Sequence, residues 1–292
     1  MNLTSLSIFL PIVLWPLTWV IVAKYGRKIG SIKTAFYRQL TIILFWSPIL
    51  YFLISYKSWA LYAHRFDICI ASISGAIFLI TNILSSNLLP FAITRIFYDS
   101  TRIIASITIW YFLLSEIVSK TDIVWIIILF AWFYAFSFTK IENTHLKIKN
   151  IPLGVGVSIL NGFLFIVSIY YFKLYSQDFT PLESAYILEG VNGSFLFIYL
   201  LFLYFLKHEN HFQIEKKDFL LLLSLSPFAL LASFGLAMAY QTIPFFLINL
   251  LFILQFILGV YFGYVFLKEK LSKKQIAPIG LILLGLMIIV LR

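Results

Sequence analysis

The feature that most limits the fold of this sequence is a succession of ten long apolar runs separated by short polar clusters. Runs of about 17–25 apolar residues are long enough to cross a bilayer as helices. Stretches such as Phe219–Leu231 are almost continuously apolar, which favours helices over the alternating strands of a membrane barrel. The predicted spans are residues 5–23, 34–54, 67–88, 91–114, 122–139, 152–172, 182–206, 218–240, 245–267 and 275–291.

Composition supports the same class of protein. Hydrophobic residues make up 62% of the 292 residues and charged residues only 12%, whereas soluble domains average roughly 25% charged residues. The first 22 residues carry no Lys or Arg, so we interpret them as a retained span rather than a signal peptide. The loops are too short to form a core of their own, and function is therefore expected inside the bundle. We predict an all-α, multi-pass integral membrane protein of a plasma membrane, such as the bacterial inner membrane.

The net charge of +10 is assigned to membrane orientation rather than to nucleic-acid binding. Most of the 22 Lys and Arg residues fall in loops on one side of the predicted spans, while Arg38, Arg95 and Arg102 fall inside spans. The positive-inside rule then places the basic loops in the cytoplasm and both termini outside.

The two halves of the chain resemble each other at a shift of about 150 residues. The segment from Leu114 to Lys120 aligns with that from Leu267 to Lys273, matching Glu116 with Glu269. A Pro-Phe pair opens the preceding span in each half. Residues 1–145 and 146–292 are thus predicted to be two five-helix repeats. Because five is odd, the second repeat enters the membrane in the opposite sense, as in many secondary transporters.

The segment Tyr264–Gly285 joins a Glu at the end of one helix, a short basic turn and a glycine-containing final helix. Together with Arg38 in the second span, it resembles the drug/metabolite transporter superfamily, in its ten-helix branch of paired EamA-type domains. The resemblance covers essentially the whole chain. It implies two inverted five-helix repeats that move small organic solutes, often by exporting amino acids or related metabolites, with both termini inside. The fourth span departs from that pattern, which has small and hydroxylated residues there.

Arg95, Asp99 and Arg102 lie at i, i+4 and i+7 on one face of the fourth span, near mid-membrane. Each uncompensated charge at a helix centre costs roughly 2.5–3.5 kcal/mol on insertion scales, so we expect partners, water or solute on this face. One interpretation is an internal ion network that locks helices together. The other is a solute pathway, in which the net positive charge favours a carboxylate or phosphate.

Glu189 is the strongest candidate for a buried acid, with Tyr186 and Asn192 three residues to either side on the same helical face. It could bind an amine or accept a coupling proton. Alternatively, it could be a fixed partner of Arg38 or of a fourth-span arginine. The repeat alignment places Gln39 opposite Glu189 and Arg38 beside it, so a zwitterion in one cavity would meet both signs of charge.

The predicted function is a secondary transporter, an exporter of amino-acid-like or carboxylated metabolites that works by alternating access. Its cavity is predicted to lie between the two halves, lined by spans two, three, four, seven, eight and nine. Alternatives are an exporter of multiple drugs or lipophilic cations, an integral-membrane enzyme acting on lipid or glycan carriers, and a non-catalytic scaffold or receptor. The expected partners are a small-molecule solute, membrane lipid and a coupling proton or ion, with no nucleic acid and the oligomeric state left open. No catalytic, cofactor or metal motif is visible, and His208 and His211 are interpreted as a solvated loop. The predicted substrate contacts are Arg38, Arg95, Asp99, Arg102, Tyr186, Glu189 and Asn192.

Overall fold

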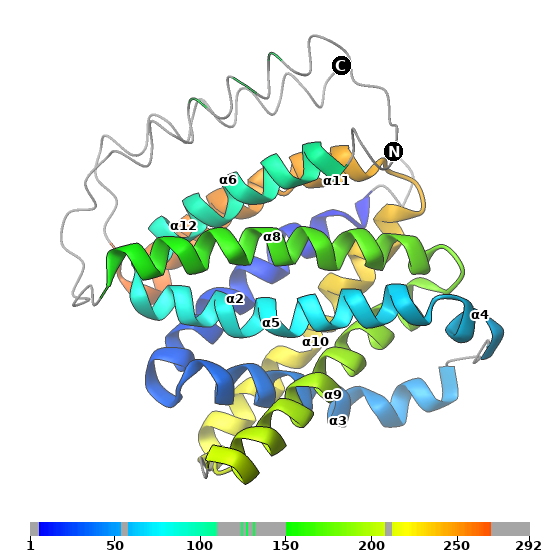
Figure 1. Ribbon diagram of the computed structural model, residues 1–292, viewed down its shortest axis with the longest axis horizontal. Coiled ribbons are helices and arrows are strands. Elements are labelled where there is room, and N and C mark those ends of the chain that lie inside the picture. Colours follow the sequence, from blue (N-terminus) through cyan, green and yellow to red (C-terminus); the bar gives the residue numbers. More distant parts are fainter. Residues whose placement is uncertain are drawn as a thin grey trace.

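The computed structural model describes residues 6–53, 58–109, 124, 127, 131, 150–207 and 212–269. In these residues, helices are the regular secondary structure and no strand occurs (Figure 1). The helices are α2 (Phe9–Ile29), α3 (Ser31–Leu53), α4 (Ser58–Ala63), α5 (Arg65–Leu88), α6 (Phe91–Ile109), α8 (Ile151–Ser176), α9 (Pro181–Lys207), α10 (Lys216–Tyr240), α11 (Phe245–Leu251) and α12 (Ile253–Leu267).

Six helical segments have the length and apolar composition to cross a membrane. The segments are Phe9–Ile29, Arg65–Leu88, Ile151–Ser176, Pro181–Leu206, Lys216–Tyr240 and Leu247–Leu267. Helices α3 and α6 are not among the six, and α6 carries three charged residues. The described part of the chain is therefore all-helical and has the character of a multi-pass membrane protein.

Eight of the ten predicted spans coincide with described helices, α11 and α12 together forming the ninth. The fifth predicted span, apart from three single helical positions, and the tenth lie outside the described residues. The first span was predicted to end at residue 23, but α2 continues to Ile29. The last turn of α2 contains Arg27 and Lys28. Such long side chains can continue a helix past its apolar region, because their charged ends reach polar surroundings. Gly30, at φ 93°, then allows the sharp reversal into α3.

Local sequence signals explain where several other helices begin and end. The side chain of Asn150 accepts a hydrogen bond from Leu153 N at 3.1 Å and caps α8. Thr180 and Glu183 form a reciprocal capping box at the start of α9, with Thr180 N donating to Glu183 Oε2 at 2.8 Å. Lys268 ends α12 in the left-handed conformation. These contacts satisfy backbone groups that a helix end would otherwise leave unpaired.

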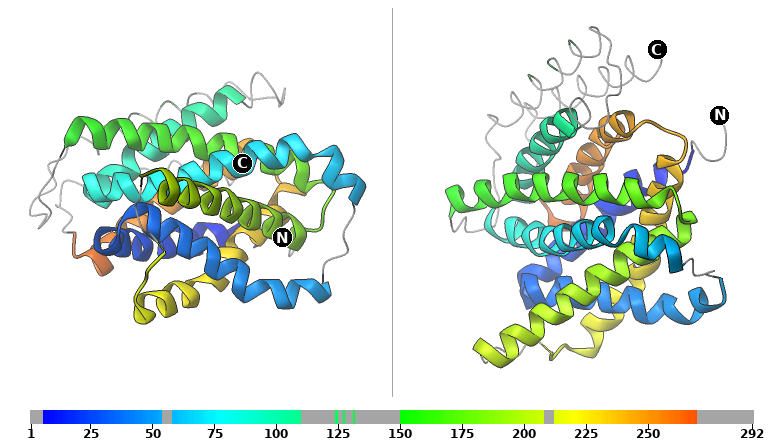
Figure 2. Two further views of the ribbon diagram at one scale, coloured as in Figure 1. Left: turned by 60° about the horizontal axis from the view of Figure 1, so that its bottom comes forward. Right: turned by 45° about the vertical axis from the view of Figure 1, so that its right-hand side comes forward.

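The packing of the helices has a regular pattern. Helix α5 packs along α8, and α10 packs along α2; α6 also packs on α8, and α12 on α2. Figure 1 shows α5 and α8 side by side, while α3 and α9, which contact each other, lie below them and cross at a slant (Figure 2). The helices thus interleave, and each half of the chain is buried mainly against the other.

Ion pairs and hydrogen bonds join helix ends at both ends of the bundle. At what we call the basic end, Arg27 of α2 donates to Ser86 O of α5 at 2.9 Å, and Lys28 lies 2.8 Å from Asp218 of α10. At the opposite end, His64 Nε2 lies 2.6 Å from Asp178, which joins the start of α5 to the turn after α8. The described helices α5 and α8 are therefore antiparallel.

Candidate functional site: a polar pocket between the two halves

A pocket lies inside the bundle and is partly open to the outside. Its wall comes from α2, α3 and α5 in the first half of the chain and from α8 and α9 in the second. The lining residues are Trp15, Trp19, Arg38, Gly75, Phe78, Leu79, Phe165, Ser168, Ile169, Leu188, Glu189 and Asn192. A mostly apolar wall with a few polar groups is typical of a small-molecule site.

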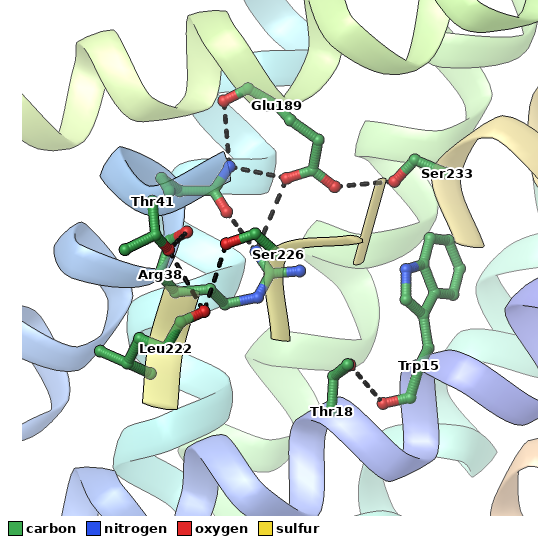
Figure 3. A network of polar contacts seen from close by, with 9 residues as sticks. Trp15, Thr18, Arg38, Thr41, Glu189, Leu222, Ser226 and Ser233 are labelled. Atoms are coloured by element: carbon green, nitrogen blue, oxygen red, sulfur yellow. Dashed lines mark hydrogen bonds and ion pairs between the residues drawn. The ribbon is translucent and has the colours of Figure 1, made fainter. Parts of the chain in front are cut away.

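Arg38 and Glu189 form the charged part of the wall and face each other across the α3–α9 crossing (Figure 3). Arg38 Nη1 lies 3.6 Å from Glu189 Oε2, and the two side chains are 4% and 5% exposed. Arg38 also donates to the side chain of Gln39, whose amide nitrogen donates to Glu189 Oε2 at 2.7 Å. Ser233 of α10 donates to Glu189 Oε1 at 2.7 Å. The side chain of Glu189, on α9, is thus held by residues of two other helices, α3 and α10.

The two charged groups differ in how far the protein satisfies them. Each carboxylate oxygen of Glu189 accepts a hydrogen bond from the protein. Arg38 Nε, in contrast, is buried and has no hydrogen-bond partner among the described residues. A buried donor left unpaired costs about 1–3 kcal/mol. Of the two groups in the pocket wall, Arg38 therefore has the greater unused capacity to bind a ligand.

The uncharged polar part of the wall is close-packed. With its amide nitrogen turned toward α5, Asn192 donates to Ser72 O at 2.8 Å. A Cβ added at Gly75 would lie 2.8 Å from the Asn192 side chain and 3.1 Å from Ser168 Oγ. Glycine at position 75 thus leaves room for these polar groups at the pocket surface.

The aromatic residues form a separate wall of the pocket, which we call the aromatic wall: Trp19, Phe78 and Phe165. Behind it lies Tyr98 of α6, whose ring centroid is 5.7–6.2 Å from those of the three wall residues. Trp15 extends the wall by stacking on Trp19 at 5.6 Å. In the sequence, only the four-residue spacing of Trp15 and Trp19 signals this wall.

The charged residues of α6 lie on the far side of the aromatic wall and do not line the pocket. Asp99 bridges the two arginines, with Arg95 Nη2 3.1 Å from Oδ2 and Arg102 Nη2 3.1 Å from Oδ1. The Arg95 guanidinium lies over the rings of Trp19 and Tyr98, at 4.6 and 4.2 Å from their centroids. We call Arg95, Asp99 and Arg102 the α6 triad. Both ion pairs of the triad lie within α6, so among the described residues they do not join helices as one interpretation had expected.

The structure therefore divides the predicted site residues into three groups. Arg38, Glu189 and Asn192 meet in the pocket, whereas the α6 triad is separate. Tyr186, though one turn before Glu189, turns aside and hydrogen-bonds Ser47 at 2.6 Å. The cavity predicted between spans two, three, four, seven, eight and nine is lined instead by spans one, two, three, six and seven. The reason is that the rings of the aromatic wall occupy the space between the pocket and α6.

Glu269 lies at the basic end, just after the last residue of α12. Its carboxylate accepts hydrogen bonds from the backbone nitrogens of Phe91 and Ala92 at 2.9 and 3.2 Å, which caps the start of α6. Arg27 lies 3.4 Å away. Burial raises the pKa of Glu269, although the two backbone donors and Arg27 oppose that shift. The end of α12 is thus fastened to α2 and α6. Its repeat counterpart, Glu116, lies outside the described residues.

No group of three or more His, Cys, Asp or Glu residues is placed to hold a metal ion in the described part of the chain. His208 and His211 lie outside it. The charged groups that the structure does bring together suit ion pairing and hydrogen bonding to an organic ligand.

Comparison with known proteins extends only to the fold. No protein-family model matches the chain, and no curated protein matches it. Solved structures do: one, described only as a crystal structure of a protein, has a TM-score of 0.68 at 13% sequence identity, over 99% of this chain and 96% of the other. At that identity the likeness shows the fold and carries no function.

Proposed function

We propose that the protein is a secondary transporter that exports small carboxylated or amino-acid-like metabolites by alternating access. The observation that carries this proposal is a pocket inside a bundle of apolar helices, walled by both halves of the chain and containing buried Arg38 and Glu189. Ionisable side chains in the interior of membrane-spanning bundles commonly mark a solute or ion pathway.

The proposal includes ten helices arranged as two inverted repeats, residues 1–145 and 146–292, in a plasma membrane such as the bacterial inner membrane. The helix contacts support the repeats, because α5–α8 and α6–α8 packing corresponds to α10–α2 and α12–α2 packing when the halves are exchanged. Gln39 and Glu189, aligned by the repeat and 150 residues apart, are in direct contact. Equivalent positions that touch each other lie near a two-fold axis, and transporters with inverted repeats commonly bind solute at the repeat interface.

The chemistry of the pocket favours a carboxylate on the solute. Arg38 offers a planar guanidinium with an unpaired Nε, which suits a carboxylate in a forked arrangement. An α-amino group would find its acceptor in Glu189. A proton or ion that exchanges with Glu189 could provide coupling, because its carboxylate is already shared between Gln39 and Ser233.

The helix ends support a closed state at the basic end. Glu269 ties α12 to the start of α6 and to Arg27 of α2. Alternating access requires contacts at one end to break while those at the other form. The Glu269 contacts join both halves of the chain, so their release would open the bundle at that end.

One observation favours a second candidate function, the efflux of lipophilic cations. Aromatic rings make up much of the pocket wall, and they attract cations through their faces by about 0.5–2 kcal/mol per contact. Arg38 opposes this function by placing a positive charge in the same wall.

Transport by the purified protein in proteoliposomes tests both functions. The panel contains amino acids, small mono- and dicarboxylates, nucleotides and lipophilic cations, each measured with and without a proton gradient. We expect uptake or efflux of an amino acid or carboxylate, and a loss of at least tenfold in Arg38→Gln. Arg65→Gln is the matched control, because Arg65 lies at the exposed opposite end of the bundle, where it stacks on Tyr62 at 4.2 Å. Transport confined to lipophilic cations, or an unaffected Arg38→Gln, would reject the carboxylate proposal.

A further inference from the structure

The α6 triad carries an excess positive charge that the described protein does not neutralise. Arg95 and Arg102 are 1% and 0% exposed, and the single carboxylate between them is that of Asp99, also 0% exposed. Two guanidinium groups and one carboxylate leave one net positive charge. Charges this deep in a protein are normally paired, because removing an ion from water costs several kcal/mol even after relaxation.

The hydrogen bonding of the triad is also incomplete. Five guanidinium nitrogens have no hydrogen-bond partner among the described residues: Nε and Nη1 of Arg95, and all three nitrogens of Arg102. Arg102 Nη2 lies within ion-pair distance of Asp99 but does not form a hydrogen bond with it. The Tyr98 hydroxyl beside the triad is likewise buried and unpaired. Asp99 Oδ2 also lacks a hydrogen bond, so the triad has five unpaired donor nitrogens and one unpaired carboxylate oxygen.

The surroundings of the triad compensate for its charge only in part. Arg95 lies over Trp19 and Tyr98, and Arg102 lies 5.2 Å from the ring centroid of Phe252. Ring faces stabilise a cation but accept no conventional hydrogen bond from it. Arg95 packs against Gly259 of α12, where an added Cβ would lie in ordinary contact, 3.8 Å from Arg95 Nε. Gly259 itself offers that nitrogen no side-chain acceptor.

We propose that the α6 triad binds one small monovalent anion, such as a halide or a carboxylate, at a site separate from the pocket. A monovalent anion balances the single excess charge, whereas a dianion such as phosphate would leave a net negative charge in the same apolar surroundings. The anion accepts the hydrogen bonds that Arg95 and Arg102 cannot make to Asp99. This site does not depend on the proposed transport function, because the charge excess exists whether or not the pocket carries a solute.

The test measures anion binding by the purified full-length chain in detergent, without any transport step. Radioactive chloride is titrated in equilibrium dialysis, and sodium acetate is the competitor. Thermal unfolding is followed in parallel in sodium chloride, sodium acetate and sodium HEPES at equal ionic strength, HEPES being too bulky for the site. We expect one saturable site per chain and a rise in melting temperature that grows with chloride or acetate and not with HEPES.

Acetate identifies the source of the anion. Displacement of chloride by acetate assigns a site shared by halides and carboxylates, and chloride binding without displacement assigns a halide site. A rise in melting temperature with acetate alone that is lost in Arg102→Gln assigns a carboxylate site at the triad rather than in the pocket. A wild-type chain with neither saturable binding nor an anion-specific rise in melting temperature overturns the proposal.

Variants distinguish an anion site from a fixed ion network. Arg102→Gln removes the excess charge and should weaken anion binding about tenfold or more, while Arg102→Lys keeps the charge without the fork and should weaken it less. Asp99→Asn raises the net charge to two and should bind the anion more tightly, with a larger rise in melting temperature. The exposed Arg65→Gln is the control and should bind as the wild type does. Binding that persists unchanged in Arg102→Gln, or weakens in Asp99→Asn, also overturns the proposal.

Discussion

Replacing Arg38 or Glu189 by glutamine should destabilise the protein strongly, whereas replacing both should cost little more than replacing one. At 3.6 Å, two opposite unit charges attract by roughly 4–5 kcal/mol at an effective dielectric constant of about 20. Removing one partner of a buried pair leaves the other uncompensated, which typically costs about 3–5 kcal/mol. Both side chains are at most 5% exposed, so solvent screening reduces the cost of the unpaired charge only slightly.

We therefore expect each single variant to lose about 3 kcal/mol of unfolding free energy and the double variant about the same. The coupling energy of the double-mutant cycle is then about 3 kcal/mol, the upper part of the range for residues in contact. It should stay below the Coulomb estimate, because Gln39 and Ser233 continue to donate to Glu189 when Arg38 is absent. The free energies come from unfolding by increasing sodium dodecyl sulfate in mixed micelles.

The matched control is the cycle on Lys217 and Glu215. These side chains approach more closely, to 2.9 Å, but are 73% and 63% exposed. Their cycle should show no coupling within error, because exposed ion pairs contribute little. If the Arg38 and Glu189 effects are additive, or no larger than the control, the two residues do not form the buried pair on which the pocket argument rests.

Three further predictions concern helix ends and packing. Glu269→Ala should lower the unfolding free energy by about 2–4 kcal/mol, because the first two N–H groups of α6 lose a charged acceptor. Glu269→Gln should recover about half of that loss in the same micelle assay. Equal losses in the two variants would refute the capping role. Burial alone would lower the pKa of His64, but hydrogen bonds and charges from Asp67 and Asp178 outweigh it and raise the pKa above 6.5. The stability that protonated His64 gives the folded chain is thus complete below pH 6.5 and is lost as the pH rises through the raised pKa. The melting temperature should therefore fall between pH 6.5 and that pKa in the wild type and stay flat in His64→Gln. Gly162→Ala should cost about 1–3 kcal/mol, since its Cβ would lie 2.5 Å from a backbone carbonyl oxygen of α6; an unchanged melting temperature would show that α8 and α6 pack less tightly.

The sequence predicted the positions of the helices better than it predicted which helices and side chains pack against each other. Apolar runs gave the positions of eight described spans, because a bilayer leaves a backbone few alternatives to a helix. The repeat alignment brought Gln39 opposite Glu189, and the two side chains are in contact. The extension of α2 to Ile29 was missed, since hydropathy marks the apolar region and not the end of a helix.

The candidate site was predicted only in part. Helical spacing put Tyr186 and Glu189 on one face, yet Tyr186 pairs with Ser47 of α3 while Glu189 faces the pocket. Spacing defines a face to within a wide arc, and neighbouring helices decide which residue of that arc meets which partner. Ser233, which fixes Glu189 from α10, gave no signal in the sequence beyond being a serine in an apolar run.

The sequence by itself determined that this chain forms long apolar helices and that the charges within its predicted spans centre on Arg38, the α6 triad and Glu189. Those conclusions follow from the cost of placing polar groups and charges in hydrocarbon, which depends on composition along the chain. Only the tertiary structure decided that Arg38 and Glu189 share a pocket while the triad lies behind the aromatic wall. That separation depends on how rings from α2, α5 and α8 fill the space between helices, and such packing is set by contacts between residues far apart in the sequence.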